Sequence, residues 1–369
     1  MAHDFATTFQ ALTGNAPFPW QTELYKRISA GNIPDSCNLP TGLGKTNVLA
    51  VWLIALANGC PVPRRLVYVV NRRTVVDQTT DEAEKFQRNA SKIGIPELAI
   101  STLRGQFADN REWSADPSRP AIICGTVDMI GSRLLFSGYG IGFKGKPLHA
   151  GFLGQDVLLV HDEAHLEPAF QELLIAIQKE QERSKEFGRF RVMELSATTR
   201  GGENAFTLSD ADRAVPEVDK RINAKKTIRW KDIQDESKLA DEIVTLALTH
   251  KDARRAVLVF VRKVDDVKKI VPKLEKGGKV RQLTGTLRGK ERDELVDDPV
   301  FRRFLPDGVS DDETVYLVCT SAGEVGVNIS ADHLVCDLTP FDSMAQRFGR
   351  VNRFGLPLEH VAQIIILNC

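Results

Sequence analysis

The sequence lacks the segments that would place the chain in a membrane or in an oxidising compartment. No apolar run approaches the roughly 18 residues of a membrane span, and the N-terminus MAHDFATTFQ has no basic region followed by an apolar stretch. The six cysteines form no CxxC pair, and several lie inside apolar runs. We therefore expect buried free thiols and a cytoplasmic protein.

An excess of charge of one sign is also missing. Lys plus Arg and Asp plus Glu both total 49, so no global positive field attracts nucleic acid. This balance argues against binding by bulk electrostatics, but it permits a channel lined by a few arginines and backbone amides. With 42% hydrophobic and 27% charged residues, the composition is that of a folded globular protein. A length of 369 residues suits two domains of roughly 150 to 200 residues each.

Short β-branched runs alternate with helical patterns along the chain. Continuous apolar strands are buried on both faces, and their alternation with helices is typical of parallel sheets. The pattern predicts an α/β fold with two parallel sheets. The predicted strands cover residues 66–70, 121–124, 157–160 and 192–195 in the first half, and 256–261, 315–319, 334–337 and 361–367 in the second.

Two polar stretches interrupt this alternation. Residues 201–226 contain Pro216 and have no sustained period, so they are predicted to connect the two halves. Residues 297–313 are charged and broken by proline, and they are predicted to form an exposed insertion. The predicted organisation is a first domain over 1–205, a linker over 206–226 and a second domain over 227–369.

The segment CNLPTGLGKTNVLAVWLIALAN joins a glycine-rich turn to a helical pattern. Its candidate phosphate-binding residues are Thr41, Gly42, Gly44, Lys45 and Thr46. Glycines let the backbone approach a phosphate, amides at the helix N-terminus donate to it, Lys45 offsets its charge and Thr46 can ligate Mg²⁺. Leu39 stands where the strict pattern GxxxxGK requires its first glycine, so the match is to the looser form PTGxGKT. A glycine-rich turn that caps a helix is the alternative.

An acidic pair follows an apolar strand in DVLLVHDEAH. Asp162 and Glu163 then lie at the C-terminal end of a strand, where open α/β sheets bind ligands. Adjacent side chains on an extended strand point apart, so Asp162 can hold Mg²⁺ while Glu163 orients and deprotonates the attacking water. A solvated strand end is the alternative. A phosphohydrolase site of the HD type, suggested by His161 with Asp162, is rejected because it needs further His and Asp ligands.

Together with further motifs in the same order, these segments resemble the DEAH/DEAD-box-like superfamily 2 helicases. The resemblance implies two tandem RecA-like domains with parallel sheets, which bind ATP and Mg²⁺ in the cleft between them. It implies that Gln21 in FPWQTELY reads the adenine, although this residue could simply begin an amphipathic helix. It also implies that His165 of DEAH, with Ser196 and Thr198 of ELSATT, couples the ATP site to the other domain and to the nucleic-acid groove.

The segment AQRFGRVNR, residues 345–353, matches the pattern QxxGRxxR of these helicases. Arg350 and Arg353 are three residues apart, which predicts neighbours on one helical face. By resemblance, the two arginines stabilise charge on the transferred γ-phosphoryl group, and Gln346 contacts the nucleotide or the DEAH histidine. Arg347 can equally be structural. A helix with a solvated basic face is the alternative for the whole segment.

Residues that follow other strands are candidates for contacts with ATP and with nucleic acid. By resemblance, Gly326 and Asn328 in TSAGEVGVNIS approach ATP. The alternative for each nucleic-acid candidate is a helix cap or an exposed charge. The candidates for contacts to the nucleic-acid backbone are Asn71, Arg72, Arg73, Thr74, Thr126 and Asp128 in the first domain, and Arg262, Thr284, Thr320 and Ser321 in the second.

Within superfamily 2, three segments are similar to the CRISPR-associated helicase of type I systems, namely VNRRTVVDQ, CGTVDMIGSRLLFSGYG and GRVNRFG. The resemblance implies an ATP-dependent translocase or helicase that moves 3′ to 5′ on single-stranded DNA. A crRNA-guided surveillance complex would recruit it to unwind target DNA for an HD nuclease, present in trans or in a segment outside this sequence. The alternatives are a superfamily 2 RNA helicase and a nucleic-acid remodelling or binding protein in which ATP acts only as a switch.

Overall fold

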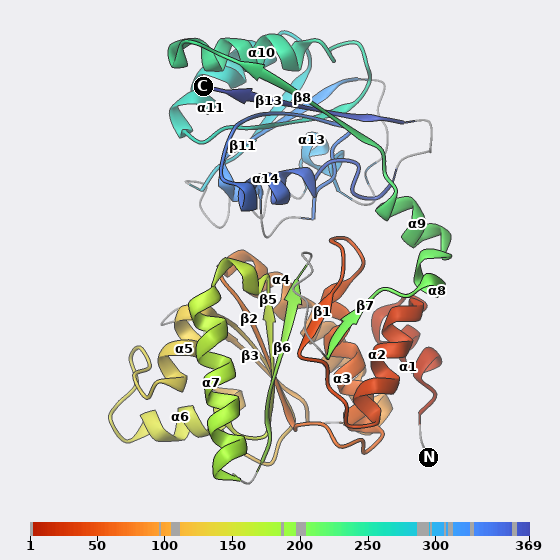
Figure 1. Cartoon of the computed structure of the whole chain (residues 1–369), viewed down its shortest axis with the longest axis vertical. Helices are drawn as coiled ribbons and strands as arrows, with labels where there is room; N and C mark the ends of the chain where they lie inside the picture. Colours follow the sequence, from red (N-terminus) through yellow and green to blue (C-terminus); the bar gives the residue numbers. More distant parts are fainter. Residues whose placement is uncertain are drawn as a thin grey trace. The chain divides into compact units, whose positions relative to one another are not determined.

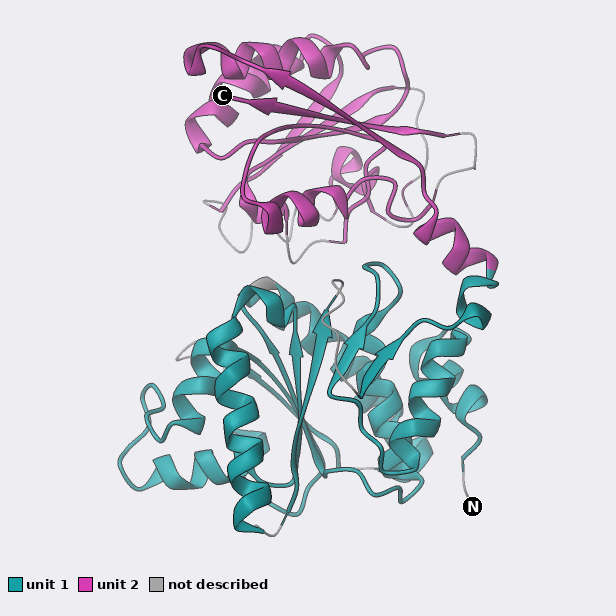
Figure 2. Ribbon diagram, viewed as in Figure 1, with its two compact units in different colours: residues 1–215 teal, residues 216–369 magenta. Residues whose placement is uncertain are grey.

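Two parallel β-sheets organise the chain, one in each of its two units. Unit 1 comprises residues 1–215 and unit 2 residues 216–369 (Figure 2). The division falls inside the predicted linker, and the two parallel sheets with their helices confirm the predicted fold class. The computed structural model describes residues 3–95, 97–104, 111–185, 188–196, 204–285, 295, 297–305, 308, 313–324, 328–355 and 360–369.

The sheet of unit 1 has the strand order β3-β4-β2-β5-β6-β1-β7, and its described strands pair in parallel (Figure 1). The predicted strands correspond to β2, β4, β5 and β6. The apolar runs miss β1 and β7 because each has three residues, and they miss β3 because Ser101 and Thr102 interrupt it. The strands are β1 (Ser36–Asn38), β2 (Arg65–Val70), β3 (Ala99–Leu103), β4 (Ala121–Thr126), β5 (Val157–Asp162), β6 (Phe190–Ser196) and β7 (Ala205–Thr207).

Helices cover both faces of this sheet. Successive residues of β2 alternate between the faces, so Tyr68 packs in the core beneath α1, α3 and α4, whereas Val67 packs beneath α5, α6 and α7. The residues from Val48 to Ala55 in α3 are all buried, which makes this helix apolar all round. The helices are α1 (Phe5–Thr13), α2 (Pro19–Ser29), α3 (Val48–Ala57), α4 (Arg73–Ala90), α5 (Val127–Leu134), α6 (Gly145–Gly154) and α7 (Pro168–Ser184).

The sheet of unit 2 has the order β10-β11-β9-β12-β13-β8 and is also parallel. Val259 of β9 packs in the core with α10 and α11, and Phe260 packs on the opposite face with α13 and α14. The strands are β8 (Lys226–Asp232), β9 (Ala256–Phe260), β10 (Lys279–Leu283), β11 (Val315–Cys319), β12 (His333–Asp337) and β13 (Ala362–Asn368). The helices named here are α10 (Leu239–Leu248), α11 (Val264–Leu274), α13 (Pro299–Arg302) and α14 (Phe341–Phe348).

The predicted exposed insertion over 297–313 is wrong for its described part. This part includes α13, and Val300, Phe301 and Phe304 are buried in the core of unit 2. Burial of these three apolar side chains is favourable, and it does not require burial of charged neighbours such as Arg302, which stays exposed to solvent.

The predicted linker over 206–226 contains regular structure. It holds the end of β7, the short helices α8 (Asp210–Arg213) and α9 (Pro216–Ile222), and the first residue of β8. Ser209 and Asp212 close the N-terminus of α8 by a reciprocal capping box. Pro216, which breaks the sequence pattern, is the first residue of α9, where its missing N–H costs no intrahelical hydrogen bond.

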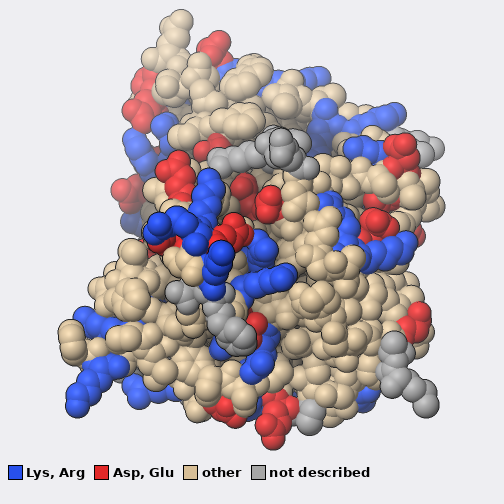
Figure 3. Space-filling view, turned by 60° about the horizontal axis from the view of Figure 1, so that its bottom comes forward, with Lys and Arg blue, Asp and Glu red and all other residues tan. Residues whose placement is uncertain are grey.

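The charged side chains on the surface are of both signs, as in the composition. Acidic and basic side chains are interspersed on the face shown in Figure 3, as the equal totals suggest.

The six cysteines are free and four of them are buried, which confirms the prediction of buried thiols. Burial raises the pKa of Cys37 and Cys124 to about 12. Among the described residues, no helix is long and apolar enough to cross a membrane.

Candidate functional site

The candidate residues of unit 1 gather at the edge of the sheet where its parallel strands end. The strand register places Val70 beside Thr126, Asp162 beside Leu195 and Asn38 beside Ser196. The loops that follow β1, β2, β4, β5 and β6 therefore leave the sheet at the same edge, which is where open α/β sheets bind ligands.

The glycine-rich turn lies between β1 and a short 3-10 turn, Lys45–Asn47, that leads into α3. Gly42 has φ 85° and Gly44 has φ 72°, left-handed conformations that favour glycine because it has no Cβ. Leu39 is buried in the core of unit 1, and its N–H donates to the Ser196 carbonyl at 3.0 Å. Packing thus accounts for leucine where the strict phosphate-loop pattern has glycine.

Lys45 and Glu163 form an ion pair across this edge. The Lys45 Nζ lies 3.2 Å from the Glu163 Oε1, and the two side chains are 9% and 17% exposed. The Nδ1 of His165 lies 3.5 Å from the other Glu163 oxygen. Glu163 therefore lies between Lys45, which was predicted to bind phosphate, and His165, which was predicted to couple the ATP site to the other domain.

The backbone of Glu163 differs from the extended geometry on which the prediction for the acidic pair relied. Glu163 has φ 52°, because β5 ends at Asp162 and a 3-10 turn begins immediately afterwards. The two acids still have different partners. The Tyr68 hydroxyl donates to Asp162 Oδ2 at 2.8 Å, whereas Glu163 accepts from Lys45.

Tyr68 is a site residue that the motifs did not identify. Its pKa lies well above the usual value, because it is buried and because the Asp162 carboxylate is close, so the hydroxyl remains a proton donor. Burial also raises the pKa of Asp162, and Lys45 opposes that rise. The sequence signal was a single tyrosine inside the apolar run of β2, which is equally typical of an ordinary core residue.

The oxygen atoms near Tyr68 fit a magnesium ion. The Tyr68 hydroxyl donates to Asp162 Oδ2 at 2.8 Å, and the Thr46 side chain is close enough to that hydroxyl to lower the pKa of Tyr68, so a carboxylate and a hydroxyl lie near one point. Mg²⁺ prefers oxygen ligands and is commonly held by one or two carboxylates together with substrate phosphates. Within the described ranges, no group of three His, Cys, Asp or Glu side chains forms a closed metal site.

Gln21 and Ser196 lie next to the glycine-rich turn but are already engaged in the fold. Gln21 is buried, and its Oε1 accepts from the Phe18 N–H at 2.8 Å, which closes the N-terminus of α2. A Cβ at Gly44 would lie 3.6 Å from the Gln21 Nε2, so this amide approaches the turn. Ser196 is buried at the end of β6, whereas Thr198 lies outside the described residues.

The nucleic-acid candidates of unit 1 lie at the same strand edge, with different exposure. Asn71, Arg73 and Asp128 are exposed. Arg72 is half-buried at the start of α4. Thr126 is buried and caps α5 by accepting from the Met129 N–H, as the alternative for this residue foresaw. The Thr74 side chain lies outside the described residues.

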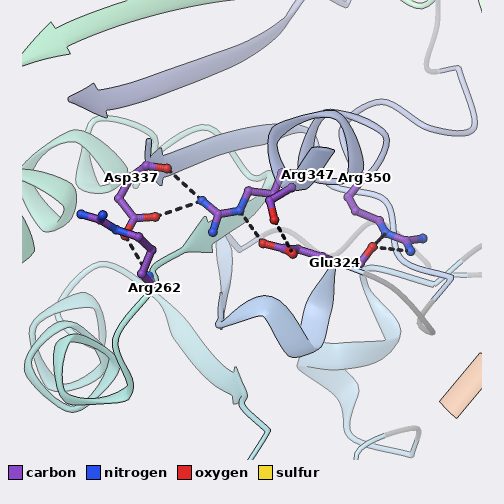
Figure 4. A network of polar contacts seen from close by, with 6 residues as sticks. Arg262, Glu324, Asp337, Arg347 and Arg350 are labelled. Carbon is purple, nitrogen blue, oxygen red and sulfur yellow. Dashed lines mark hydrogen bonds and ion pairs between the residues drawn. The ribbon is translucent and has the colours of Figure 1, made fainter. Parts of the chain in front are cut away.

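Unit 2 contains a buried polar network centred on Arg347 (Figure 4). Its Nε donates to the Glu324 carboxylate at 2.9 Å, and its Nη1 donates to the side chain and the backbone oxygen of Asp337 at 2.9 and 2.8 Å. The Asp337 carboxylate also accepts from the backbone N–H and the Nε of Arg262. Arg347 is 1% exposed and therefore structural, one of the two predicted possibilities.

Glu324 joins this network to Arg350. The Nε and Nη2 of Arg350 donate to the backbone carbonyl of Glu324 at 3.2 and 2.8 Å (Figure 4). One residue thus fixes Arg347 through its carboxylate and Arg350 through its carbonyl. Neither Glu324 nor Asp337 was predicted, although an acid at the end of the apolar run LVCD and another inside TSAGEVG were visible in the sequence.

The prediction that Arg350 and Arg353 share a helical face is wrong. Helix α14 ends at Phe348, and Val351 then forms an isolated parallel bridge with Ala331. Asn352 has φ 45°, and its N–H donates to the Ala331 carbonyl at 2.8 Å. Backbone pairing with Ala331 replaces helical hydrogen bonds here, so both arginines lie in an irregular segment after the helix.

The other candidates of unit 2 differ in exposure. Thr284 and Thr320 are buried where β10 and β11 end, and the Thr320 N–H donates to the Leu283 carbonyl at 3.2 Å. Ser321 and Asn328 are exposed. Gln346 is half-buried in α14, whereas Gly326 lies outside the described residues.

Two protein-family models match the chain, one in each half. Residues 16–201, just over half of the chain, match the family described as type III restriction enzyme, res subunit. Residues 253–355 match the family described as CRISPR-associated nuclease/helicase Cas3, C-terminal. No curated protein matches the chain by sequence.

Solved helicase structures share the fold at low sequence identity. T. fusca Cas3 aligns with a TM-score of 0.66 and 14% identity, over 97% of this chain and 47% of that one. S. cerevisiae Dbp5 bound to RNA and ADP BeF3 aligns with a TM-score of 0.59 and 18% identity, over 98% of this chain and 86% of that one. The DUF1998 helicase MrfA bound to DNA aligns with a TM-score of 0.68 and 16% identity, over 100% and 51%.

The chain spans about half the length of the Cas3 structure that it matches. At these identities the structural likeness shows the fold, and the family matches supply the assignment. The chain therefore belongs to the family of type III restriction enzyme res subunits, and it is a superfamily 2 helicase core whose second unit is similar to the C-terminal part of the CRISPR-associated nuclease/helicase Cas3.

Proposed function

We propose that the chain is an ATP-dependent translocase or helicase that moves 3′ to 5′ on single-stranded DNA and acts in type I CRISPR interference. The observation that carries this proposal is the Lys45–Glu163 ion pair beside Asp162 and Thr46 at the strand edge, in a chain of a helicase family. Crystal structures of T. fusca Cas3 with AMPPNP and with ADP support ATP as the nucleotide.

In the proposed site, phosphate groups replace Glu163 as the partner of Lys45. Thr41, Gly42 and Gly44 bring the backbone of the turn around the phosphates, while Gln21 contacts the adenine. Released from Lys45, the Glu163 carboxylate orients and deprotonates the attacking water. Asp162 and Thr46 hold Mg²⁺, which offsets charge on the phosphate oxygens when bound.

In this proposal, residues of the second unit also act on the nucleotide. Arg350 and Arg353 stabilise the charge that develops on the γ-phosphoryl group, and Gln346, Gly326 and Asn328 approach the nucleotide. The two hydrogen bonds from Arg350 to the Glu324 carbonyl support this role, because a guanidinium that is fixed beforehand needs no reorganisation during the reaction.

The proposal also assigns residues that contact the nucleic-acid strand and residues that transmit the state of the ATP site. Domains over 1–205 and 227–369, joined by the linker over 206–226, grip the strand alternately as ATP binds and products leave. His165, Ser196 and Thr198 transmit the state of the nucleotide. The residues proposed to contact the strand are Asn71, Arg72, Arg73, Thr74, Thr126 and Asp128, with Arg262, Thr284, Thr320 and Ser321 from the second domain.

The proposed partners follow from the Cas3-like match of unit 2. A crRNA-guided surveillance complex recruits the chain in the cytoplasm to the displaced strand. The chain then moves that strand to an HD nuclease, which is present in trans or in a segment outside this sequence.

The test compares single-stranded DNA with single-stranded RNA as activators of ATP hydrolysis. We expect stimulation by DNA, and stimulation by RNA alone would favour the RNA-helicase alternative, to which the likeness with RNA-bound Dbp5 points. Directional displacement of a streptavidin block, lost in Glu163→Gln, separates a motor from a protein in which ATP is only a switch.

A further inference from the structure

Two contacts connect the first elements of unit 2 to the segment that carries Arg350 and Arg353. We call residues 348–355 the arginine segment, since it begins at the end of α14 and contains both arginines. One contact comes from α9, and the other comes from the first residue of β8. Both elements precede the second sheet in the sequence, close to the division between the units at residue 215.

The first contact is a close approach of two backbones at Gly355. This glycine has φ 68°, and a Cβ at this position would lie 2.7 Å from the carbonyl carbon of Lys220 and closer still to its oxygen. Lys220 belongs to α9, so its carbonyl cannot rotate aside as a flexible side chain could. Only glycine lets the end of the arginine segment pack against α9 in this way.

The second contact fixes the beginning of the same segment. The Lys226 Nζ donates to the backbone carbonyl of Phe348 at 2.9 Å. Phe348 is the last residue of α14, where carbonyls lack an intrahelical partner and favour a cation. Lys226 therefore connects the first strand of unit 2 to the end of α14, where the arginine segment begins.

The middle of the arginine segment is held by a different part of unit 2. The Asn352 N–H donates to the Ala331 carbonyl at 2.8 Å, and the Arg353 N–H donates to the Ser330 hydroxyl at 3.0 Å. Residues 330–331 thus fix the interior of the segment, while α9 and β8 fix its two ends.

We propose that Gly355 and Lys226 are positioning residues, through which α9 and the start of β8 set Arg350 and Arg353 for phosphoryl transfer. This inference rests on the proposed function, because it takes the two arginines as the groups that act on the nucleotide. Since α9 is the first element of unit 2, a force carried along the chain from unit 1 reaches α9 before it reaches the second sheet.

The main test compares Gly355→Ala with Gly59→Ala. Gly59 has the same φ of 68° but no atom within 4 Å of an added Cβ, so the control carries the same backbone strain without the collision. We expect Gly355→Ala to lower the kcat for DNA-stimulated ATP hydrolysis by about tenfold or more, with the KM for ATP within about twofold of wild type. Gly59→Ala should leave both constants unchanged.

A second pair of variants tests the other contact. Lys226→Met should lower kcat by a few-fold, Lys226→Arg should restore it because the guanidinium can also donate to Phe348, and Lys225→Met, an exposed neighbour, should have no effect. A role limited to stability would instead lower the thermal midpoint of both Lys226 variants and leave kcat per folded molecule unchanged.

Hydrogen exchange makes the outcome independent of activity. In Gly355→Ala without nucleotide, the Asn352 and Arg353 amides should exchange faster than in wild type and in Gly59→Ala. Unchanged kcat and exchange in Gly355→Ala, with an active wild type, would overturn the inference. An inactive wild type would contradict the proposed function instead, and the exchange rates alone would then decide whether α9 positions the segment.

Discussion

The two units hold their charged site residues in different ways. In unit 1, Lys45 and Glu163 form a partly accessible ion pair, whereas in unit 2 Arg347 is 1% exposed and bonds to two buried acids. The Lys45–Glu163 pair keeps some exposure, so either side chain can exchange its partner, whereas a buried network leaves an uncompensated charge when it is broken. Under the proposed function, Lys45 of unit 1 stays available to a ligand, while Arg347 of unit 2 belongs to a fixed, buried network.

The backbones of the two sites show the same contrast. The turn of unit 1 depends on left-handed glycines, Gly42 and Gly44, which permit an anion to approach the amides. The arginine segment of unit 2 is instead pinned by hydrogen bonds to Ala331 and Ser330. Substitutions in these contacts, and a lower pH, should therefore affect the two units differently.

The largest expected effect is that of Lys45→Ala. Without the ammonium group, the turn loses the cation that offsets phosphate charge, so ATP hydrolysis should fall to background while much of the binding to single-stranded DNA remains. Steady-state ATPase assays and fluorescence anisotropy with a labelled oligonucleotide measure the two effects. Full hydrolysis by this variant would refute the assignment of the phosphate-binding turn.

The next effect is that of Arg350→Ala in unit 2. We expect nucleotide binding to remain and kcat to fall by about 10³ to 10⁵, the range for other arginine fingers. Equilibrium binding of a fluorescent ATP analogue, together with single-turnover hydrolysis, separates the two properties. Unchanged turnover would remove Arg350 from the proposed mechanism.

A smaller effect, on stability, is expected for Arg347→Met. Loss of the guanidinium leaves the buried Glu324 carboxylate without a cation and leaves Asp337 with Arg262 alone, which should lower the free energy of unfolding of unit 2 by about 3 to 5 kcal/mol. Urea unfolding followed by hydrogen exchange in β9 would measure it.

Arg262→Met is the matched control for that variant. The Arg262 side chain is 46% exposed, and its backbone N–H still donates to Asp337, so its loss should cost less than about 1 kcal/mol. Equal losses in both variants would show that burial does not distinguish these two contacts.

The smallest expected effect is the loss of stability of unit 2 in mild acid. His250 stacks on His333 with ring centroids 4.1 Å apart, and His360 lies beside His333. Burial, then the neighbouring histidines and Arg255, lower the pKa of His333 to about 3, and burial lowers that of His250. The unfolded chain therefore binds protons that the folded unit does not bind.

Because of this difference in proton binding, a lower pH decreases the stability of unit 2. Stability is complete above the unfolded pKa of about 6.5 and decreases as the pH falls toward 3, by about 2 kcal/mol for His333 at pH 5. Among the described residues of unit 1, His161 is a comparable group, because burial is the main cause that lowers its pKa to about 4. Hydrogen exchange between pH 7 and 5 should show a greater loss in unit 2, and His333→Gln should reduce it. A greater loss in unit 1 would contradict the prediction.

The strands that the sequence predicted all lie at the interior of the two sheets, although the three-residue interior strand β1 was missed. Interior parallel strands such as β2 and β9 are buried on both faces and need unbroken apolar runs, which are visible in a single sequence. The edge strand β8 was missed because most of its side chains are exposed, including Trp230. β10 was missed because its polar residues Arg281 and Gln282 interrupt the run.

The α/β class and the glycine-rich turn with its lysine and hydroxyl could be predicted from the sequence alone. A buried parallel strand requires consecutive apolar residues, and a turn for phosphate requires glycine, lysine and a hydroxyl in a fixed order, so both are readable among neighbours along the chain. Only the tertiary structure decided that Lys45 pairs with Glu163, 118 residues away, and that Glu324 holds both Arg347 and Arg350. These partners depend on which strand ends the sheet brings together, and that order is set by the packing of the whole unit.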